Sequence, residues 1–505
     1  MFGICSYGGY VPKYRLNRGL VYAAMGWMNP ANIANAAGEK AVANFDEDSI
    51  TMAVAAGIDA LNGIDRSTVD AVYFASTTMP YKERLNAGII TPALGLRDHV
   101  RAADFSGGIK AGTITPALGL RDHVRAADFS GGIKAGTTAL IAALEGVESK
   151  RLNNVVVTAS DCRLGKPSSP QELIFGDAAA ALIVGSKDVI AEFKGSYSIT
   201  DHYRGAFTKY DRQWEDRWIR DLGFVQFIPE AVNGLLDKYK LKMDDFTKVV
   251  YPCHYGGARK KLGGMLGIAP EADQNNLQAE LGETGTPHSL VMLVKALEEA
   301  NPGDKILVVS FGSGCDALFF EVTDKIKKLK SRNGISGCLA NKADLDNYTK
   351  YLVWRDILPG EKGMRGEEDN WTRWSSLWRA RTFVFGLWGG KCKKCGTAQL
   401  PPQKICVNPE CGAVDAMEPY LFSDKIGKIA SFTGDMLAAS VNPPAVYGAV
   451  EFDEGGKYYF DFTDCDLESL ETGMPVYMSF RRKYFDDRRD ISGYFWKAVP
   501  QKEVK

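Results

Sequence analysis

The sequence of 505 residues contains no long apolar run and no excess of charge of either sign. No apolar stretch approaches the roughly 18–20 residues that a membrane-spanning helix needs. The 61 lysines and arginines nearly balance the 62 aspartates and glutamates, which leaves no strongly basic surface for nucleic acid or anionic lipid. The amino terminus lacks the basic and long apolar segments of a signal peptide. These absences predict a cytoplasmic protein that binds neither membranes nor nucleic acid.

Cysteine is also too sparse for a disulfide scaffold, with ten residues in the whole chain. Apolar residues make up 45% of the composition and charged residues 24%, which is the balance of an ordinary globular protein. A chain of this length is expected to form two or three domains.

A tandem duplication interrupts the first third of the chain. Residues Ile90–Thr113 recur letter for letter as Ile114–Thr137. Two identical copies argue against a solenoid, because solenoid repeats diverge and occur at least three times. A single core has room for one copy. We predict that 85–96 completes a helix, that the second copy supplies a strand and the start of a helix, and that roughly 98–122 form an extruded loop.

Short apolar runs alternate with amphipathic stretches from residue 40 to residue 325. The apolar runs, typical of buried strands, are 71–75, 154–160, 179–185, 248–252 and 305–311. The helical patterns include 47–62, 134–148, 228–240 and 288–300. Strands separated by helices of this length predict a layered α/β domain over 1–325, with helices covering the sheets.

The remainder of the chain changes character. Residues 326–385 mix charged residues with tryptophans, and we interpret them as a connecting helical arm, since free linkers are poor in aromatics. The short segment 386–414 carries a cysteine cluster. Over 415–505, strand-like runs separated by turns predict a small β-barrel of the OB type; the runs are 429–433, 445–450, 458–462 and 475–480.

Four of the ten cysteines form two short pairs, Cys392 with Cys395 and Cys406 with Cys411. Two such pairs on tight turns suit the tetrahedral coordination of Zn²⁺ by four thiolates. The alternative is a redox-active Cys-x-x-Cys motif, although nothing thioredoxin-like surrounds the pairs. We predict a zinc ribbon over 386–414 with a structural Zn²⁺, because four protein ligands leave no open position for catalysis.

A second set of motifs lies in the α/β domain. They are AGTTAL (135–140), FGDAAAALIVG (175–185), a strand-end histidine (His254), GETG (282–285) and SFGSG (310–314). On these residues, 1–325 resemble the thiolase superfamily, most closely 3-hydroxy-3-methylglutaryl-CoA synthase and the ketoacyl-carrier-protein synthase III type. The carboxy-terminal part, with GKCKKCG and LPPQKIC, resembles the zinc-ribbon and OB-fold domain that accompanies acyl-CoA thiolases. The resemblance implies a layered αβαβα fold for the first domain.

The resemblance also implies a catalytic site with a nucleophilic cysteine at a helix amino terminus, a histidine and a further polar group. His254 matches the family histidine, and Glu283 stands where the synthase III type has asparagine. His288 lies beside that turn and is a third candidate catalytic residue. Gly312 and Gly314 match the glycine turn beneath the site, where backbone approaches closely, and are assigned to binding of the CoA thioester.

The nucleophile departs from the family pattern. The family cysteine position is occupied by Ile133, and isoleucine cannot form an acyl-enzyme. The thiols of Cys162, Cys253 and Cys315 flank the same predicted sheet ends and are alternative nucleophiles. Ser130 is a weaker candidate, because no activating base is evident for it.

The leading functional prediction is an acyl-CoA-handling acyltransferase, a Claisen-type condensing or cleaving enzyme of the hydroxymethylglutaryl-CoA synthase-like branch. The alternative is a non-catalytic acyl-CoA-binding scaffold subunit that pairs with a true thiolase. The missing cysteine favours the scaffold, whereas His254 and the glycine turns favour the enzyme. The resemblance further implies a homodimer in which sheet edges of two subunits join, or a complex with a separate thiolase. A nucleic-acid role of the barrel is disfavoured because the chain has no basic excess.

Overall fold

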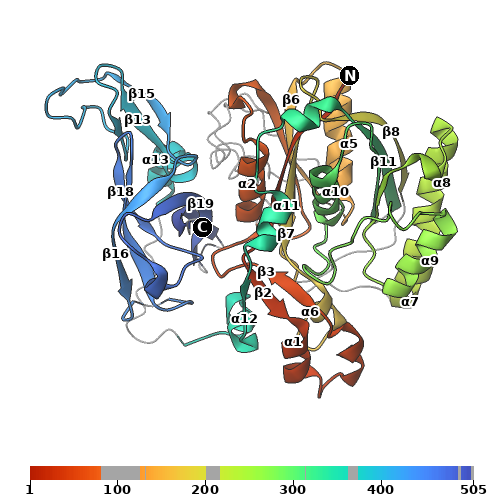
Figure 1. The fold of residues 1–505 in the computed structure, drawn as a ribbon. Helices are drawn as coiled ribbons and strands as arrows, with labels where there is room; N and C mark the ends of the chain where they lie inside the picture. The colour runs from red at the N-terminus through yellow and green to blue at the C-terminus, as the bar shows by residue number, and fades with distance from the viewer. Residues whose placement is uncertain are drawn as a thin grey trace.

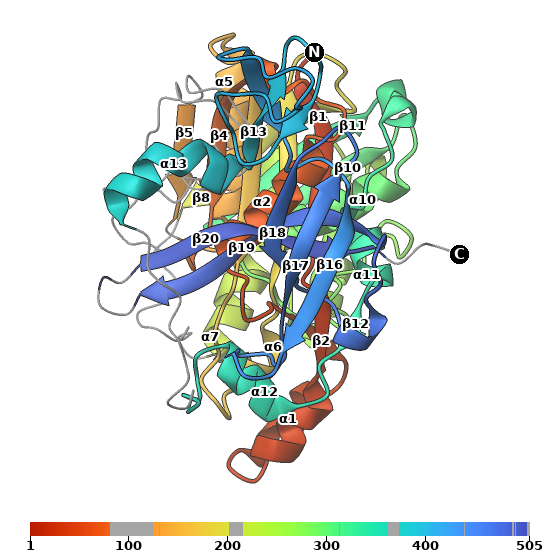
Figure 2. The same cartoon turned by 90° about the vertical axis from the view of Figure 1, so that its left-hand side faces the viewer.

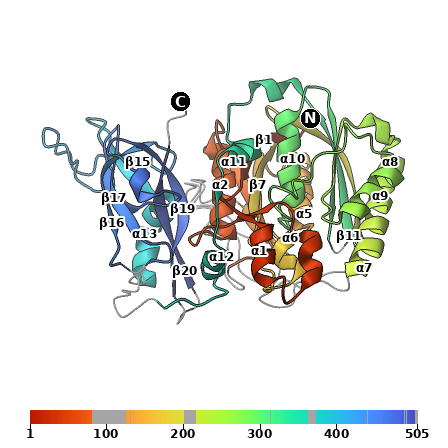
Figure 3. The ribbon, with the colours of Figure 1, turned by 60° about the horizontal axis from the view of Figure 1, so that its bottom comes forward.

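The computed structural model describes residues 1–80, 125–130, 132–200, 216–312, 314–361, 373–438, 440–486, 489 and 491–501. These residues form an α/β part and a β-rich part, which lie side by side and are joined by a helical arm (Figures 1 and 3). Among them, no helix combines the length and the apolar character that crossing a membrane requires.

A mixed sheet of nine strands, in the order β5-β4-β6-β7-β1-β8-β11-β10-β9, organises the described α/β part. The strands are β1 (Gly3–Tyr10), β4 (Val69–Ala75), β5 (Arg125–Phe129), β6 (Asn154–Asp161), β7 (Ala178–Gly185), β8 (Ala191–Thr200), β9 (Lys248–Val250), β10 (Lys305–Phe311) and β11 (Gly314–Val322). A smaller sheet consists of β2 (Tyr14–Asn17), β3 (Glu39–Val42) and β12 (Ala343–Asp344). β1 and β8 pair at Gly3 and Ile4 alone, so the large sheet divides into two halves there.

The central strands of the first half are buried on both faces. Every residue of β7 is buried, and so is every residue of β6 after the first. Continuous apolar runs such as AAAALIVG in β7 are typical of strands that are covered on both sides. β4 runs parallel to β5 and β6, and β9 runs parallel to β10. The loops that follow parallel neighbours therefore gather at one edge of each half.

Helices separate and cover the two halves in five layers (Figure 1). α2 (Ser49–Ala60) packs on the outer face of β1, β6 and β7. α5 (Ala135–Glu148) and α10 (His288–Glu299) lie in the middle, since α10 contacts β1 and β7 on one side and β9 and β10 on the other. α8 (Ile228–Tyr239) and α9 (Gly256–Leu266) form the opposite outer layer. The predicted layered αβαβα architecture is confirmed.

The predicted ranges of strands and helices agree closely with the observed ones. Among the described residues of the α/β part, each end of a predicted strand or helix lies within two residues of the observed end. The second copy of the repeat supplies β5 and the start of α5, as predicted, whereas the expected helix over 85–96 and loop over 98–122 lie outside the described residues. The strands β1 and β8 were not predicted, because glycines and polar residues interrupt the apolar runs in their sequences. The shorter helices of this part are α1 (Arg18–Met25), α6 (Pro170–Ile174) and α7 (Asp216–Trp218).

The arm contains α11 (Gly334–Ala340), α12 (Tyr348–Trp354) and α13 (Trp374–Gly386). After it, β13 (Trp388–Cys392) pairs with β14 (Ala398–Gln399) and β15 (Met417–Leu421). The last five strands form an antiparallel sheet in the order β18-β17-β16-β19-β20 (Figure 2). They are β16 (Gly427–Asp435), β17 (Ala445–Phe452), β18 (Lys457–Asp461), β19 (Pro475–Asp486) and β20 (Ile491–Pro500). The predicted β-rich end is thus present, and its assignment to the OB type stays a prediction.

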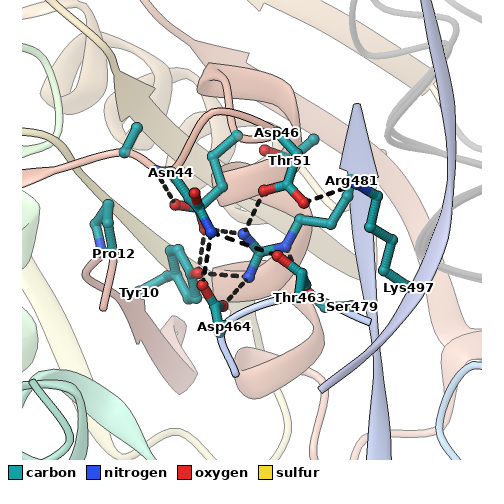
Figure 4. Close-up of polar contacts among 12 residues, drawn as sticks. Tyr10, Pro12, Asn44, Asp46, Thr51, Thr463, Asp464, Ser479, Arg481 and Lys497 are labelled. Carbon is teal, nitrogen blue, oxygen red and sulfur yellow. Dashed lines mark hydrogen bonds and ion pairs between the residues drawn. The ribbon is translucent and has the colours of Figure 1, made fainter. Parts of the chain in front are cut away.

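A buried ion network joins this last sheet to the α/β part (Figure 4). Arg481 of β19 pairs with Asp46 at 3.1 Å and Glu47 at 2.8 Å, both of which precede α2. The same guanidinium pairs with Asp464 at 2.5 Å, and Lys497 of β20 lies 3.0 Å from Asp46. The Arg481 side chain is 1% exposed. Because these charges lie between the two parts, they fix how the β-rich end sits on α2.

Candidate active site

The amino terminus of α5 meets the glycine turn that follows β10. The side chain of Ile133, two residues before α5, is half-buried. A Cβ added to Gly312 would lie 2.6 Å from Cγ1 of Ile133 and 2.9 Å from the backbone nitrogen of Lys134. A Cβ added to Gly314 would likewise lie 2.0 Å from the carbonyl oxygen of Ile199 in β8. Both predicted glycines therefore permit a close backbone approach, and Gly312 lies directly beside the position of the family cysteine.

A charged contact fixes the first turn of α5 to β11. The Nζ of Lys134 lies 3.0 Å from Oδ1 of Asp316, which is 1% exposed. The hydroxyls of Thr137 and Thr138 donate to Oδ2 of the same carboxylate at 2.8 and 3.1 Å. The positive end of the helix dipole and the Lys134 ammonium thus lie together next to Ile133.

Asp161, at the end of β6, gathers the neighbouring loops around one buried carboxylate. Its Oδ1 accepts from the Ser76 hydroxyl at 2.9 Å and from the Thr77 amide at 2.7 Å. Its Oδ2 accepts from the Thr77 hydroxyl at 2.9 Å and from the Thr286 amide at 2.8 Å. Burial raises the pKa of Asp161, and these donors oppose that shift. Asp161 therefore holds the loop after β4 and the 282–286 turn against each other.

Glu283 lies in that turn and forms a buried ion pair with Arg163. Its second oxygen accepts from the Gly285 amide at 3.0 Å. The Arg163 guanidinium stacks on the Phe175 ring at 3.7 Å from its centroid. An ionised carboxylate only accepts hydrogen bonds, so Glu283 cannot donate one as the family asparagine could. The ionised Glu283 carboxylate therefore holds the 282–286 turn in place through Arg163 and the Gly285 amide.

His288 begins α10, and its side chain is buried among the same loops. Its Nδ1 accepts from the Thr284 amide at 2.9 Å, and its Nε2 lies 2.8 Å from the carbonyl oxygen of Asn276. These two partners require the neutral tautomer with the proton on Nε2. Burial lowers the pKa of His288, which also favours the neutral ring. Both ring nitrogens are engaged by backbone, which is the pattern of a residue that positions the turn.

His254 has a different environment, because it lines an open pocket. The imidazole follows β9 and is half-buried. Its ring lies 5.7 Å from Phe224 in an edge-on arrangement, and Phe224 in turn lies 4.4 Å from Phe311. Phe224 belongs to a π-helix (Ile219–Phe227), a rare conformation that is frequent at functional sites. Because Phe311 directly precedes Gly312, this aromatic row connects His254 to the turn beside α5.

The pocket at His254 has a volume of about 630 Å³. Residues 29–35 form one wall, and the π-helix with the start of α9 forms the other. Arg220 and Lys261 bring positive charge to this pocket from separate helices. Asp221 accepts two hydrogen bonds from Arg220, both at 2.8 Å, and offsets part of that charge. The pocket is large enough for a sizeable ligand, and its cations suit an anionic one.

The three scattered thiols differ in burial, since Cys253 and Cys315 are buried and Cys162 is half-buried. Burial raises the pKa of Cys253 to about 12, and its thiol donates to the carbonyl oxygen of Tyr255 at 3.7 Å. Burial also raises the pKa values of Cys162 and Cys315 well above the usual range for a thiol. Such thiols keep their protons, whereas the reactive species is the thiolate. Burial thus disfavours the thiolate of each of the three, and a replacement cysteine stays a prediction.

The four clustered cysteines of the ribbon lie close together, away from this pocket. All four sulfurs fall within 4.8 Å of one another. Cys392 and Cys411 are 3.8 Å apart at Sγ, and Cys395 and Cys406 are 3.5 Å apart. A tetrahedron with Zn–S bonds of about 2.3 Å has sulfur–sulfur edges of about 3.8 Å. The cluster therefore fits a Zn²⁺ ion bound by four thiolates, as its spacing predicted.

The structure brings some predicted site residues together and separates others. Glu283, His288 and Gly312 lie around the first turn of α5, because Gly136 of that turn packs on the Thr286 carbonyl. His254 is separated from them by the rings of Phe224 and Phe311 and lines a different pocket. The two pocket cations, Arg220 and Lys261, were not predicted. Nothing in their local sequence distinguishes them from other exposed basic residues, since only folding brings them to one cavity.

Comparisons with known proteins point to one group of enzymes. The chain is 31% identical to the hydroxymethylglutaryl-CoA synthase of Pyrobaculum aerophilum over 370 residues, which cover 70% of this chain and 98% of that protein. The protein of the same name from Caldivirga maquilingensis is 32% identical, with the same coverage. That of Methanocaldococcus jannaschii is 30% identical and covers 70% of this chain and 99% of its own length.

Solved structures match the fold of the α/β part. A crystal structure of HMG-CoA synthase complexed with CoA has a TM-score of 0.56 at 15% identity, over 74% of this chain and 95% of that one. OleA of Xanthomonas campestris, solved with lauric acid and lauroyl-CoA, has a TM-score of 0.52 at 15% identity, over 64% of this chain and 98% of its own. Residues 385–418 match the ChsH2 rubredoxin-like zinc ribbon domain.

Proposed function

Because the chain belongs to the hydroxymethylglutaryl-CoA synthase family, we propose that it is an acyltransferase of that branch whose substrate is a CoA thioester bound in the His254 pocket. The observation that carries this proposal is the pocket itself. It places an imidazole and the cations of Arg220 and Lys261 in one cavity of about 630 Å³. Coenzyme A combines anionic phosphates at one end with a reactive thioester at the other.

The pocket residues divide between these two ends of the ligand. Lys261 and Arg220 bind the phosphates, since cations form charge-assisted hydrogen bonds with phosphate oxygens. The His254 imidazole donates to the thioester oxygen and stabilises the negative charge that develops there. Gly312 and Gly314 let the turn after β10 pack closely against Ile133 and against Ile199 of β8. Glu283 and His288 position the turn beside α5 through the contacts described above.

The carboxy-terminal domain contributes structure to this proposal. Cys392, Cys395, Cys406 and Cys411 would hold a Zn²⁺ ion, which crosslinks the ribbon when bound. The ribbon then supports the last sheet, whose Arg481 network sits against α2. The domain therefore packs on the α2 side of the α/β part, opposite the layer of α8 and α9 that borders the pocket.

A homodimer is part of the same proposal. Among the described strands, β5 stands at the end of the nine-stranded sheet, and it would pair with the same strand of a second subunit. A complex with a separate thiolase is the second assembly that we propose. Mass measurement of the native protein, alone and with a thiolase from the same source, distinguishes the two.

Binding and turnover of acetyl-CoA test the proposed function. Lys261→Ala should weaken binding by about tenfold, because it removes one charge-assisted contact. His254→Ala should lower kcat by roughly 100-fold with little change in binding, since it removes a hydrogen bond made chiefly in the transition state. Lys187→Ala, in the exposed turn after β7, is the matched control and should change neither quantity. Tight binding without turnover in any acyl-acceptor assay would instead support the scaffold alternative.

A further inference from the structure

We propose that the buried ion network between α2 and the last sheet holds one titratable proton, on Glu47, and that loss of this proton at rising pH loosens the contact between the two parts of the chain. Figure 4 shows the network, in which Arg481 of β19 meets the carboxylates that precede α2. A CoA thioester has no part in this contact, so the inference is independent of the proposed function. Its content is a measurable property, a local opening that increases with pH.

Three carboxylates surround two cations in this network. One nitrogen of the Arg481 guanidinium lies 3.1 Å from Asp46 and 2.8 Å from Glu47. The other nitrogen lies 2.5 Å from Asp464, and the Lys497 ammonium lies 3.0 Å from Asp46. These five side chains are between 1% and 9% exposed. When all five are ionised, the buried cluster therefore carries one negative charge in excess.

Two further cations, Lys13 and Arg482, lie beside the cluster. They donate to backbone carbonyl oxygens at 2.5 and 2.7 Å. Both side chains are partly exposed, so water screens much of their charge. Asp48 adds a fourth carboxylate nearby, which accepts from the Tyr494 hydroxyl at 2.6 Å. Because buried charge without a partner is costly, a proton taken up by one of these carboxylates stabilises the closed contact.

Glu47 is the carboxylate whose contacts suit a proton. The Tyr10 hydroxyl donates to its Oε1, and the Asn44 amide donates to its Oε2 at 2.8 Å. A protonated Glu47 can keep the first contact by donating to the Tyr10 oxygen, because a hydroxyl both donates and accepts. Asp46 instead contacts both cations, and Asp464 accepts from the guanidinium and from the Asn44 side chain. These two carboxylates are therefore the ones that stay ionised.

The pKa values agree with this distribution of charge. Burial raises the pKa of Glu47 from 4.5 to about 7, although Arg481 opposes the shift. Burial also acts on Asp46, but Lys497 and Arg481 outweigh it and lower the pKa of that carboxyl. Between about pH 4.5 and pH 7 the closed contact binds more protons than an open one, so its stability falls as the pH rises. The stabilisation is complete below this range and lost above it.

Titratable and charged groups from several elements face Glu47. They are Tyr10 of β1, Asp46 and Asp48 before α2, Cys162 after β6, Asp464 before β19, Tyr477 and Arg481 of β19, and Lys497 of β20. Burial raises the pKa values of both tyrosines and of the thiol above their ordinary ranges, so these groups stay neutral up to pH 8. Burial also raises the pKa of Asp48, and a variant of Asp48 therefore belongs in the test.

Amide hydrogen exchange of the full-length protein measures the opening. Peptides from 44–56 and 475–482 are followed between about pH 5.5 and about pH 8, with the chemical exchange rate divided out and 305–311 of β10 as the internal reference. Opening of the first two should increase roughly 25-fold over this range, as the shift of the Glu47 pKa requires. Glu47→Gln, which mimics the protonated side chain, should remove most of this rise. Glu451→Gln, at an exposed ion pair, is the matched control and should retain it.

Two more variants separate the excess charge from the other carboxylates. Asp464→Asn removes one negative charge, and asparagine suits the left-handed backbone there, where φ is 55°. Glu47 should then ionise more readily, and the rise in opening should shrink. Asp48→Asn keeps an N-cap on α2 and should retain most of the rise. A wild type that opens equally at both ends of the pH range, or a Glu47→Gln variant that keeps the rise, would overturn the proposal. An unchanged rise in Asp464→Asn would overturn the role of the excess charge.

Discussion

Ile133 and Gly312 are packed so closely that a Cβ on residue 312 would lie 2.6 Å from Cγ1 of Ile133. The side chain at the family cysteine position is therefore a packing element of the glycine turn. The glycine turn after β10 and the amino terminus of α5 therefore meet at Ile133.

Gly312→Ala should lower the free energy of unfolding by about 1–3 kcal/mol, because the added methyl group overpacks this contact. Urea unfolding measures the change. Gly264→Ala, in α9 with no atom within 4 Å of an added Cβ, is the matched control and should be neutral or slightly stabilising. Ile133→Ala in the Gly312→Ala background should recover part of the loss. Strictly additive effects of the two substitutions would contradict the contact.

Removal of one ribbon cysteine should unfold the ribbon. The purified protein is expected to contain about one Zn²⁺ per chain, and Cys395→Ser should lose it, because the binding energy of such sites is folding energy. Metal analysis and limited proteolysis of 386–418 follow the two effects. Cys465→Ser, outside the cluster, should retain the metal. A metal-free wild type, or a water ligand in the zinc sphere, would contradict a structural site.

Arg481→Met should destabilise the contact between the two parts of the chain. The substitution leaves the carboxylates of Asp46, Glu47 and Asp464 buried without their shared cation, which typically costs about 3–5 kcal/mol. Lys457→Met is the control, since its ion pair with Glu451 is exposed and contributes about 1 kcal/mol or less. Denaturant unfolding measures both. A loss for Arg481→Met no larger than that of the control would show that the network is not energetically coupled.

Lys40 should make stability depend on pH in the alkaline range. Burial lowers its pKa from 10.5 to about 7, although Glu172 and Asp177 oppose the shift. Between these values the unfolded chain binds more protons than the native protein, so the free energy of unfolding rises with pH, by at most about 1.4 kcal/mol per unit. Below pH 7 the penalty for burying the charge is fully present.

Lys40→Met removes this titration, so the stability of the wild type relative to the variant should increase from pH 7 to pH 10.5. Urea midpoints at several pH values provide the comparison. Lys342→Met, at an exposed ion pair with Glu39, should give a profile parallel to that of the wild type. If the Lys40→Met profile is also parallel, the native pKa of Lys40 is not lowered.

Deletion of residues 98–121 removes one repeat length and should leave the fold intact. The second copy supplies β5 and the start of α5, and both elements remain complete in the deletion variant. Soluble yield and circular dichroism check the result. A deletion variant that does not fold would mean that both copies are structural.

Local patterns of sequence predicted most of the architecture. The run at 179–185 is apolar at every position and became β7, because a strand covered on both faces needs no polar side. The amphipathic pattern at 228–240 became α8. β1 was not predictable, because its glycines and its serine make GICSYGGY look like a loop until it is paired with β7. For the site, the motifs predicted His254 and the glycine turn, while the environment of each residue had to come from its neighbours in space.

The sequence by itself determined most of the buried strands, the longer helices and the pairing of the four ribbon cysteines, because hydrophobic period and cysteine spacing are properties of neighbouring residues. The tertiary structure alone decided which side chains share a cavity. Arg220, His254 and Lys261 lie on three different elements, and only their packing makes one pocket of them. It also decided which thiols are buried, and burial raises the pKa values of Cys253 and Cys315. Desolvation and long-range contact are set by the whole chain, and no short window of residues encodes them.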